Sequence, residues 1–379
     1  MKIVFITPYP PMHDGLAINS HKQVVELRNM GHDVTVVSTR DTDAANGVPH
    51  AFTASPLAMW RTFRYLRSAK PEVIHVQYVI AAYGLLSLPL WIMLVMLRRQ
   101  SRIVATYHEV KRETKLLGPV GRIYYQFISR IAHHITVHTA EAVSILTNAC
   151  KIAPSKVTHI NIPLFVEKQS AQDVEKVRSK FKLGDAPVVL FFGFIHIDKG
   201  IDHLVRAFAI AKKAGNLHGA KLVIAGSVRK REGIFKLFEK KDVNYEAEIH
   251  QLVADLKLKK DVIFTPYVPD DEVAAWFSHA SIVALPYTNL EQSAVLSLAL
   301  GNRRPMIVSN LGGLGETMSG TDALVPPADE DALAAKLGYF LNDPMQGQKL
   351  VKQYKRICDE RTIQVIAEDI VAVYKKVRA

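Results

Sequence analysis

The sequence has little cysteine: Cys150 and Cys358 are the two among 379 residues. Two cysteines cannot form the disulfide framework of a small secreted domain, so we expect a reducing, cytoplasmic environment. Neither has a histidine or a second cysteine at metal-ligand spacing, which predicts two inert thiols in the core. The apolar run within residues 1–8 is too short for a signal peptide and indicates a first buried strand.

Two common nucleotide-binding signatures are also missing. The loop after the first predicted strand, residues 8–15, is not the Gly-x-Gly-x-x-Gly turn of dinucleotide-dependent dehydrogenases. There is no P-loop either, which argues against an ATPase. An uncharged run over residues 79–97 has the length of a membrane span. It contains Gly84 and Pro89 and lies between two predicted strands, so we expect a buried or membrane-surface helix, with a span as the less favoured alternative.

Strand patterns alternate with helix patterns twice along the chain, as in doubly wound parallel sheets. The first half predicts strands over residues 2–7, 33–38, 73–77, 102–107 and 134–138. After a polar stretch the second half predicts strands over residues 188–192, 221–225, 262–265, 281–285 and 305–309. We therefore predict two α/β domains, over residues 1–165 and 186–358, with a final helix over 362–377 that packs back on the first.

Ligands of doubly wound sheets bind beyond the carboxyl ends of the strands, at helix N-termini. Gly15 ends the first such loop, where it is either a turn residue or lets the main chain approach a phosphate. The loop over residues 193–200 places Lys199 just before a helix, either as a diphosphate ligand or as a solvated side chain. Residues 285–294 and 309–316 are further loops of this kind. Several such loops at one sheet edge predict a phosphate-binding site.

Together these segments resemble the retaining glycosyltransferases of family 4, which have the GT-B fold. The motifs in the second half are Phe191-Phe192-Gly193 with Lys199-Gly200, Ile224-Ala225-Gly226, Tyr267-Val268-Pro269-Asp270, Leu285-Pro286-Tyr287, Arg304-Pro305-Met306-Ile307 and Gly312-Gly313-Leu314-Gly315-Glu316. Those in the first half are Gly31-His32-Asp33-Val34-Thr35-Val36-Val37 and Thr106-Tyr107-His108. The resemblance implies two Rossmann-like domains that face each other across a cleft, the first for the acceptor and the second for a nucleotide-sugar donor.

The resemblance also implies roles for individual residues. His108 would contact the transferred sugar and Lys199 would neutralise the donor phosphates. Further donor contacts would come from Gly15, Gly193, His196, Val268, Gln292, Ser293 and Ala294. The family needs no metal or cofactor, and the sequence has no Asp-x-Asp pair placed to bind a metal. Cations and helix N-termini would then stabilise the leaving diphosphate.

The donor loop departs from the family pattern. Most members carry Glu-x7-Glu ahead of an Arg-Pro or Lys-Pro turn. The corresponding pair here is Leu290 and Leu298, or Thr288 and Leu296, depending on how the loop is counted. Glu291 is the nearest substitute for the first carboxylate, which makes it a candidate catalytic residue. The second carboxylate, which binds ribose hydroxyls in the family, has no replacement.

A variant subgroup of the family has Gln-Ser-Gly in this loop, and Gln292-Ser293-Ala294 resembles it. In that subgroup an arginine stands where this chain has His196, and a neutral imidazole is the weaker phosphate ligand. The favoured function is a hexosyltransferase of cell-envelope polysaccharide biosynthesis that acts on a lipid-linked or polysaccharide acceptor. The alternatives are a weak or inactive nucleotide-sugar-binding protein and, less favoured, a nucleotide-sugar 2-epimerase. The sequence does not distinguish a UDP-sugar from a GDP-sugar.

The net charge of +12 is concentrated in the first half, where residues 1–160 contain 18 Lys and Arg against 9 Asp and Glu. Residues 59–70 interleave aromatic side chains with cations, namely Trp60, Phe63, Arg61, Arg64, Arg67 and Lys70. Wound as a helix, they predict a basic face that suits an anionic membrane surface, and a solvated helix is the alternative. No nucleic-acid-binding motif is present. We therefore expect a peripheral protein at the inner face of the cell membrane.

Overall fold

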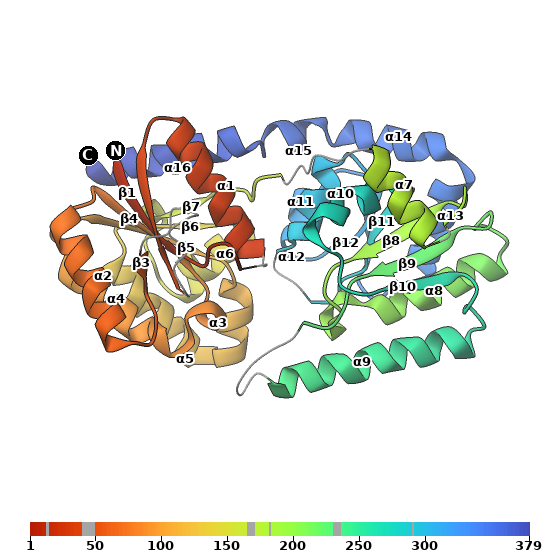
Figure 1. The fold of residues 1–379 in the computed structure, drawn as a ribbon, viewed down its shortest axis with the longest axis horizontal. Coiled ribbons are helices and arrows are strands. Elements are labelled where there is room, and N and C mark those ends of the chain that lie inside the picture. Colours follow the sequence, from red (N-terminus) through yellow and green to blue (C-terminus); the bar gives the residue numbers. More distant parts are fainter. Residues whose placement is uncertain (13–14, 40–49, 165–170, 182, 230–235, 290–291) are drawn as a thin grey trace. The chain divides into compact units, whose positions relative to one another are not determined.

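The computed structural model describes residues 1–12, 15–39, 50–164, 171–181, 183–229, 236–289 and 292–379 (Figure 1). The chain forms two compact units, Met1–Pro163 with Glu360–Ala379, and Leu164–Asp359. Each unit consists of one parallel sheet and its flanking helices. This confirms the doubly wound, Rossmann-like architecture that the alternating pattern predicts.

The sheet of the first unit has seven parallel strands in the order β3-β2-β1-β4-β5-β6-β7. The strands are β1 Lys2–Thr7, β2 Asp33–Ser38, β3 His50–Ala51, β4 Val73–Tyr78, β5 Arg102–Tyr107, β6 His134–Val137 and β7 Val157–His159. The five predicted strands of this half are all present. The edge strands β3 and β7 were not predicted, because two or three residues are too few to display a hydrophobic pattern.

Alternate side chains of these strands enter two separate cores. Val4 and Ile6 of β1 belong to the core beneath α2 (Pro56–Ala69), α4 (Ser87–Leu97) and α5 (Val110–Ile131). Ile3 and Phe5 belong to the core beneath α1 (Gly15–Asn29) and α16 (Ile363–Arg378). The remaining short helices of this unit are α3 Ile80–Tyr83, η2 Gly84–Leu86, α6 Ala140–Ser144, η3 Ile145–Ala149 and η4 Pro154–Lys156.

The uncharged run over residues 79–97 does not form one continuous helix. Gly84 adopts a positive φ of 51° between α3 and a short 3-10 turn, and α4 follows. One side of α4 is buried in the core, while Leu88 and Ile92 on its other side are exposed. In the part of the chain that the structure describes, no helix is both long enough and apolar enough to cross a membrane.

The sheet of the second unit has six parallel strands in the order β10-β9-β8-β11-β12-β13. The strands are β8 Val188–Phe192, β9 Lys221–Ala225, β10 Val262–Thr265, β11 Ile282–Leu285, β12 Met306–Ser309 and β13 Leu324–Val325. The helices are α7 Ala171–Lys180, η5 Ile197–Lys199, α8 Ile201–Lys213, α9 Lys236–Asp255, α10 Asp270–His279, α11 Ala294–Gly301, α12 Gly312–Thr317, α13 Glu330–Asn342, α14 Pro344–Gln353 and α15 Lys355–Asp359. Only β13 was not predicted, again because it is short. Cys150 and Cys358 form no disulfide and are buried, as predicted for core thiols.

The last helix, α16, packs on α1 and on the sheet of the first unit. Its Tyr374 hydroxyl lies 2.6 Å from Nδ1 of His75, a buried residue of β4. Nε2 of His75 lies 2.7 Å from the Thr106 hydroxyl on β5. Burial lowers the pKa of His75 to about 3, so the ring is neutral and has one donor and one acceptor nitrogen. Tyr374 and Thr106 together satisfy both nitrogens.

We predict that Tyr374→Phe lowers the free energy of unfolding of the first unit by about 1–3 kcal/mol, because the substitution leaves a buried imidazole nitrogen without a partner. Urea denaturation of the full chain checks this value. Tyr339→Phe is the matched control, because the Tyr339 hydroxyl also bonds a side chain but is exposed. Equal, small effects of the two substitutions would contradict the prediction.

Candidate functional site

Three neighbouring strands of the second unit, β8, β11 and β12, end at the same edge of its sheet. The loop after β8 leads to α8 and the loop after β11 leads to α11. A main-chain hydrogen bond joins these two loops, because the N–H of Thr288 donates to the carbonyl oxygen of Asp198 at 3.0 Å. The two segments that the sequence singles out for phosphate binding therefore form one structure.

Two glycines permit this close approach. Gly200, with a φ of 61°, lies against the other loop, and a Cβ added to it would lie 2.1 Å from the carbonyl oxygen of Pro286. Gly226 directly follows β9, and a Cβ there would lie 2.1 Å from the carbonyl oxygen of Gly193, which directly follows β8. Any side chain at Gly200 or Gly226 would push two loops apart at the sheet edge.

Lys199 lies at the end of the 3-10 turn η5, immediately before Gly200. Its ammonium is 3.9 Å from the centroid of the Tyr287 ring, which is completely buried. The Tyr287 hydroxyl in turn lies 3.3 Å from the hydroxyl of Ser293. Tyr287 thus connects the lysine of one loop with the helix start of the other. The sequence shows this tyrosine as part of a motif, but nothing in it indicates the contact with Lys199.

Ser293 is the N-cap of α11, where its hydroxyl accepts a hydrogen bond from the N–H of Leu296 at 3.4 Å. Ala294 is the first residue of the helix, so its N–H group is among those without an intrahelical partner. Such groups favour an anion at the helix N-terminus. Gln292 is half-buried just before the cap. Glu291, the predicted catalytic carboxylate, lies outside the described residues.

His196 has a different environment from the one expected of a phosphate ligand. Its Nδ1 accepts a hydrogen bond from the N–H of Asp198 at 3.2 Å, which makes Nε2 the protonated nitrogen. Nε2 lies 3.6 Å from a carboxylate oxygen of Asp242, a buried residue of α9. The imidazole therefore offers one donor, Nε2–H, and the Asp242 carboxylate beside it competes with a phosphate for that donor.

Val268, one of the predicted donor contacts, follows β10 at the same sheet edge, and its side chain is buried in the core. The neighbouring Tyr267 is exposed and offers an aromatic ring. The loop that the sequence predicts to bind the donor thus lies at this edge, and it exposes the aromatic side chain of Tyr267.

His108 follows β5 in the first unit, at the carboxyl edge of the sheet. Its Nε2 lies 2.6 Å from Oε1 of Gln77, near the end of β4, and its ring centroid lies 4.7 Å from that of His138. Burial, and then the neighbouring His138 and His75, hold the pKa of His108 well below its usual value. His108 is thus a neutral histidine that is still partly exposed.

A series of buried amides determines which nitrogen of His108 carries the proton. The amide of Gln77 donates to Oε1 of Gln23 at 3.2 Å, and the amide of Gln23 donates to Oδ1 of Asn19 at 3.1 Å. Because Oε1 of Gln77 can only accept, Nε2 of His108 must donate to it. The Nδ1 atom of His108 is then a hydrogen-bond acceptor. Gly15 is exposed as the first residue of α1, the helix that carries Asn19 and Gln23.

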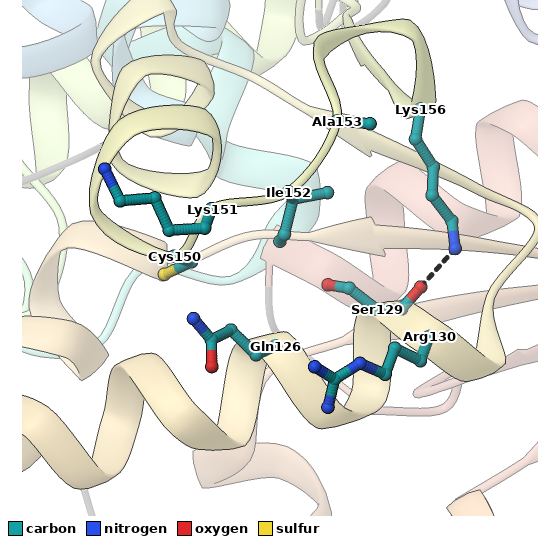
Figure 2. A pocket seen from close by; sticks show the side chains of 8 residues that line it. All are labelled: Gln126, Ser129, Arg130, Cys150, Lys151, Ile152, Ala153 and Lys156. Atoms are coloured by element: carbon teal, nitrogen blue, oxygen red, sulfur yellow. Dashed lines mark hydrogen bonds between the residues drawn. The ribbon is translucent and has the colours of Figure 1, made fainter.

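The structure also has a pocket in the first unit that does not belong to this arrangement (Figure 2). It lies between the C-terminal part of α5 and residues 150–156, and Lys156 donates to the carbonyl oxygen of Ser129 at 2.5 Å. These segments immediately precede β6 and β7. The pocket is therefore at the amino edge of the sheet, opposite to the edge that carries His108, and is not the expected ligand site.

His108 and Gly15 lie at the carboxyl edge of the first sheet, and Lys199, Gly193 and Ser293 lie at that of the second. Among the described residues there is no cluster of three or more His, Cys, Asp or Glu that could hold a metal ion. In the second unit, the Lys199 ammonium and the first main-chain N–H groups of α11 lie at the carboxyl edge of the sheet; in the first unit, the neutral imidazole of His108 does.

Two family models match the chain. Residues 173–357 match "Glycosyl transferases group 1" and residues 15–163 match "Glycosyltransferase Family 4". The MMP alpha-(1->4)-mannosyltransferase of Mycolicibacterium hassiacum is 30% identical over 274 residues, which are 68% of this chain and 59% of the relative. The alpha-D-kanosaminyltransferase of Streptomyces kanamyceticus is 20% identical over 66% of this chain and 64% of the relative. The chain thus spans about three fifths of the length of these relatives.

Solved structures resemble the chain over nearly its whole length. The Anabaena protein HepE, solved with UDP and glucose, has a TM-score of 0.79 at 16% identity and covers 99% of both chains. The sucrose-phosphate synthase of Thermosynechococcus elongatus has a TM-score of 0.74 at 20% identity and covers 99% of this chain and 98% of its own. At these identities the likeness concerns the fold, and it confirms the predicted GT-B fold.

We predict that Gly200→Ala weakens the binding of UDP or GDP by about tenfold or more, because the new methyl group forces the loop with Lys199 away from Pro286. Isothermal titration calorimetry with each nucleotide measures this. Gly215→Ala is the matched control: Gly215 has a similar positive φ of 75°, but a Cβ there meets no atom within 4 Å. Both variants lose about 1–2 kcal/mol of stability to left-handed strain, and only Gly200→Ala should lose affinity.

Proposed function

The chain belongs to the group 1 glycosyltransferases, and on that premise we propose that it moves a hexose from a nucleotide-diphosphate sugar to a lipid-linked or polysaccharide acceptor. The observation that carries the proposal is the position of Lys199. Its ammonium is held over the buried ring of Tyr287, beside the N-terminus of α11. A cation and a helix N-terminus side by side are suited to a diphosphate.

In the proposed reaction, the bond between the anomeric carbon and the donor diphosphate breaks while the acceptor hydroxyl oxygen bonds to the same carbon. The configuration at that carbon is retained, and the acceptor proton leaves with the diphosphate. Negative charge develops on the departing diphosphate, where the Lys199 ammonium and the first N–H groups of α11 stabilise it. Preorganised groups of this kind supply much of the barrier reduction in group transfer. We propose that these groups make a metal ion unnecessary.

His108 is proposed to bind the transferred sugar. The buried amides of Gln77, Gln23 and Asn19 leave its Nδ1 as an acceptor, which suits a sugar hydroxyl. A neutral imidazole also avoids repulsion with positive charge that develops on the sugar ring in the transition state. Its contribution should therefore appear in turnover more than in nucleotide affinity.

A second candidate function is nucleotide-sugar binding without efficient transfer. His196 favours this function, because it lies between Asp198 and Asp242. In the variant subgroup an arginine stands at this position and would face the phosphates. The second candidate function is also favoured by Leu296, a buried apolar residue at one of the two positions where the family carries its ribose-binding carboxylate. Incubation with UDP-sugars and GDP-sugars without acceptor separates the two functions. Release of free sugar and nucleotide supports a transferase, and binding without any release supports the second candidate.

We predict that Lys199→Ala weakens nucleotide-diphosphate binding about tenfold or more, since a charge-assisted hydrogen bond contributes roughly 1.5–3 kcal/mol. Calorimetric titration with UDP and GDP is the measurement. Lys213→Ala, which removes an exposed cation at the other end of α8, is the control and should leave affinity unchanged. If the two variants bind nucleotide equally well, Lys199 is not a phosphate ligand.

We predict that His108→Ala lowers kcat about tenfold or more and changes nucleotide affinity less than about twofold, because the proposed contact is with the sugar. Steady-state kinetics with the active donor and calorimetry with the nucleotide alone test the two parts. Gln77→Leu should also lower kcat, because it removes the acceptor that keeps the proton on Nε2 of His108 but leaves the imidazole ring in place. A parallel loss of nucleotide affinity in His108→Ala would contradict the assignment.

A further inference from the structure

Two neighbouring helices of the first unit expose an unusual set of side chains. The exposed residues of α4 are all apolar: Leu88, Ile92, Val95 and Met96. The exposed residues of α5 are all either apolar or basic: Arg112, Lys115, Leu116, Leu117, Pro119, Val120, Arg122, Ile123, Phe127 and Arg130. An ordinary solvated helix would instead expose a mixture of acidic, basic and neutral polar residues. The composition therefore indicates a partner other than water.

The apolar residues lie on one side of each helix. Leu88, Ile92 and Val95 follow the spacing of a single helix face, as do Val120, Ile123 and Phe127. α4 contacts α5, and both cover the same face of the sheet (Figure 1). We define the α4–α5 face as Leu88, Ile92, Val95, Met96, Leu116, Val120, Ile123 and Phe127, which are between 48% and 80% exposed. Large exposed apolar patches mark interaction sites.

The position of this face is set by buried contacts beneath it. Gly118, with a φ of 55°, divides α5 into two segments, and Pro119 begins the second. The carboxylate of Glu113 in the first segment accepts hydrogen bonds from the Tyr125 hydroxyl of the second and from the N–H of Ile80 at 2.7 Å. The two segments of α5 are thereby joined to each other and to α3, and the exposed side chains are held on a fixed support.

Cations surround the α4–α5 face. Lys115, Arg122 and Arg130 are exposed on α5 and form no ion pair within the described part of the chain. Arg98 and Arg99 follow the end of α4 and are exposed. α2, which contacts α4, adds exposed Leu57, Trp60, Arg61, Arg64 and Arg67, with the Arg64 guanidinium 4.7 Å from the Trp60 ring centroid. The structure describes every residue of α2, α4 and α5, and none of their exposed residues is acidic.

We propose that the α4–α5 face seats the first unit on an anionic phospholipid bilayer, with its apolar side chains among the acyl-chain ends and its cations at the headgroups. Amphipathic helices with an apolar face and a basic border lie at membrane interfaces in this way. Each cation near an anionic leaflet raises the affinity about fivefold. The sequence suggested the basic face of α2 and a membrane-surface helix within residues 79–97; in the structure α2 supplies border cations, and the inserted side chains come from α4, which lies in that run, and from α5.

This surface extends the proposed function, since a lipid-linked acceptor would be reached at the bilayer, but the seating needs neither donor nor acceptor. Flotation of the full chain with vesicles therefore tests it separately from sugar transfer. One set of vesicles contains phosphatidylcholine alone, and the other contains equal parts of phosphatidylcholine and phosphatidylglycerol. We expect tight binding to the anionic vesicles at low salt, much weaker binding to the neutral ones, and partial loss at about 1 M salt, where charges are screened.

Two variants separate the apolar from the electrostatic contribution. Ile92→Asn/Val120→Asn/Ile123→Asn should weaken binding to anionic vesicles at least about tenfold. Lys115→Gln/Arg122→Gln/Arg130→Gln should weaken it as much and should also reduce its salt dependence, because the arginines that follow α4 and those of α2 remain. The matched controls lie in the second unit: Val243→Asn/Met345→Asn and Lys259→Gln/Lys260→Gln/Lys349→Gln, all at exposed positions. Each variant should have the same melting temperature as the parent chain, because all the substituted positions are exposed.

Several results would overturn the proposal. One is the absence of binding to anionic vesicles at low salt. Another is binding that the α4–α5 variants and the second-unit controls reduce equally. A third is a concentration-dependent dimer of the parent chain in analytical ultracentrifugation, together with no binding of the parent chain to vesicles. If the apolar variant is then monomeric, the α4–α5 face binds a second copy of the chain. Nucleotide titration of the same variants without vesicles should be normal, so a failure of donor binding remains distinguishable.

Discussion

In both units every strand pairs with its neighbours in parallel, so all strands of a sheet end at the same edge. This constraint brings together residues that are far apart in the sequence. Loops after β8 and β11 meet although nearly a hundred residues separate them, and a hydrogen bond from Thr288 to Asp198 joins them. The same constraint places Gln77 of β4 beside His108, which follows β5. The chemistry proposed for this protein depends on these two edges.

Close approach at the sheet edge makes particular demands on the main chain. Gly200 and Gly226 are required because carbonyl oxygens occupy the space where a side chain would be. Tyr287 contributes differently, because the ammonium of Lys199 lies over the face of its buried ring. A lysine held in this way loses less conformational freedom when a phosphate binds, which favours binding. The fold thus orders a flexible side chain at the site where we propose that the donor diphosphate binds.

Buried polar groups in the first unit have a related effect. The pKa of His75 is lowered to about 3 by burial, and its two nitrogens are satisfied by Tyr374 and Thr106. His75 therefore links the last helix to the sheet and has no free nitrogen for catalysis. His108 has a similar neutral ring but remains partly exposed, with one nitrogen engaged by Gln77. Accessibility, and not residue type, distinguishes the candidate catalyst from the structural histidine.

Much of this protein follows from the sequence alone. Continuous apolar runs determined the long strands, because parallel strands are buried on both faces, and the glycine-bracketed loop identified Lys199 as a candidate ligand. The sequence could not reveal which distant groups would surround a side chain. His196 is held by Asp242 from α9, and the apolar run over residues 79–97 is divided at Gly84, so that α4 exposes one side beside α5. Local pattern determines where strands and helices form, whereas contacts between them depend on how the sheets and helices pack, and only the tertiary structure decides those.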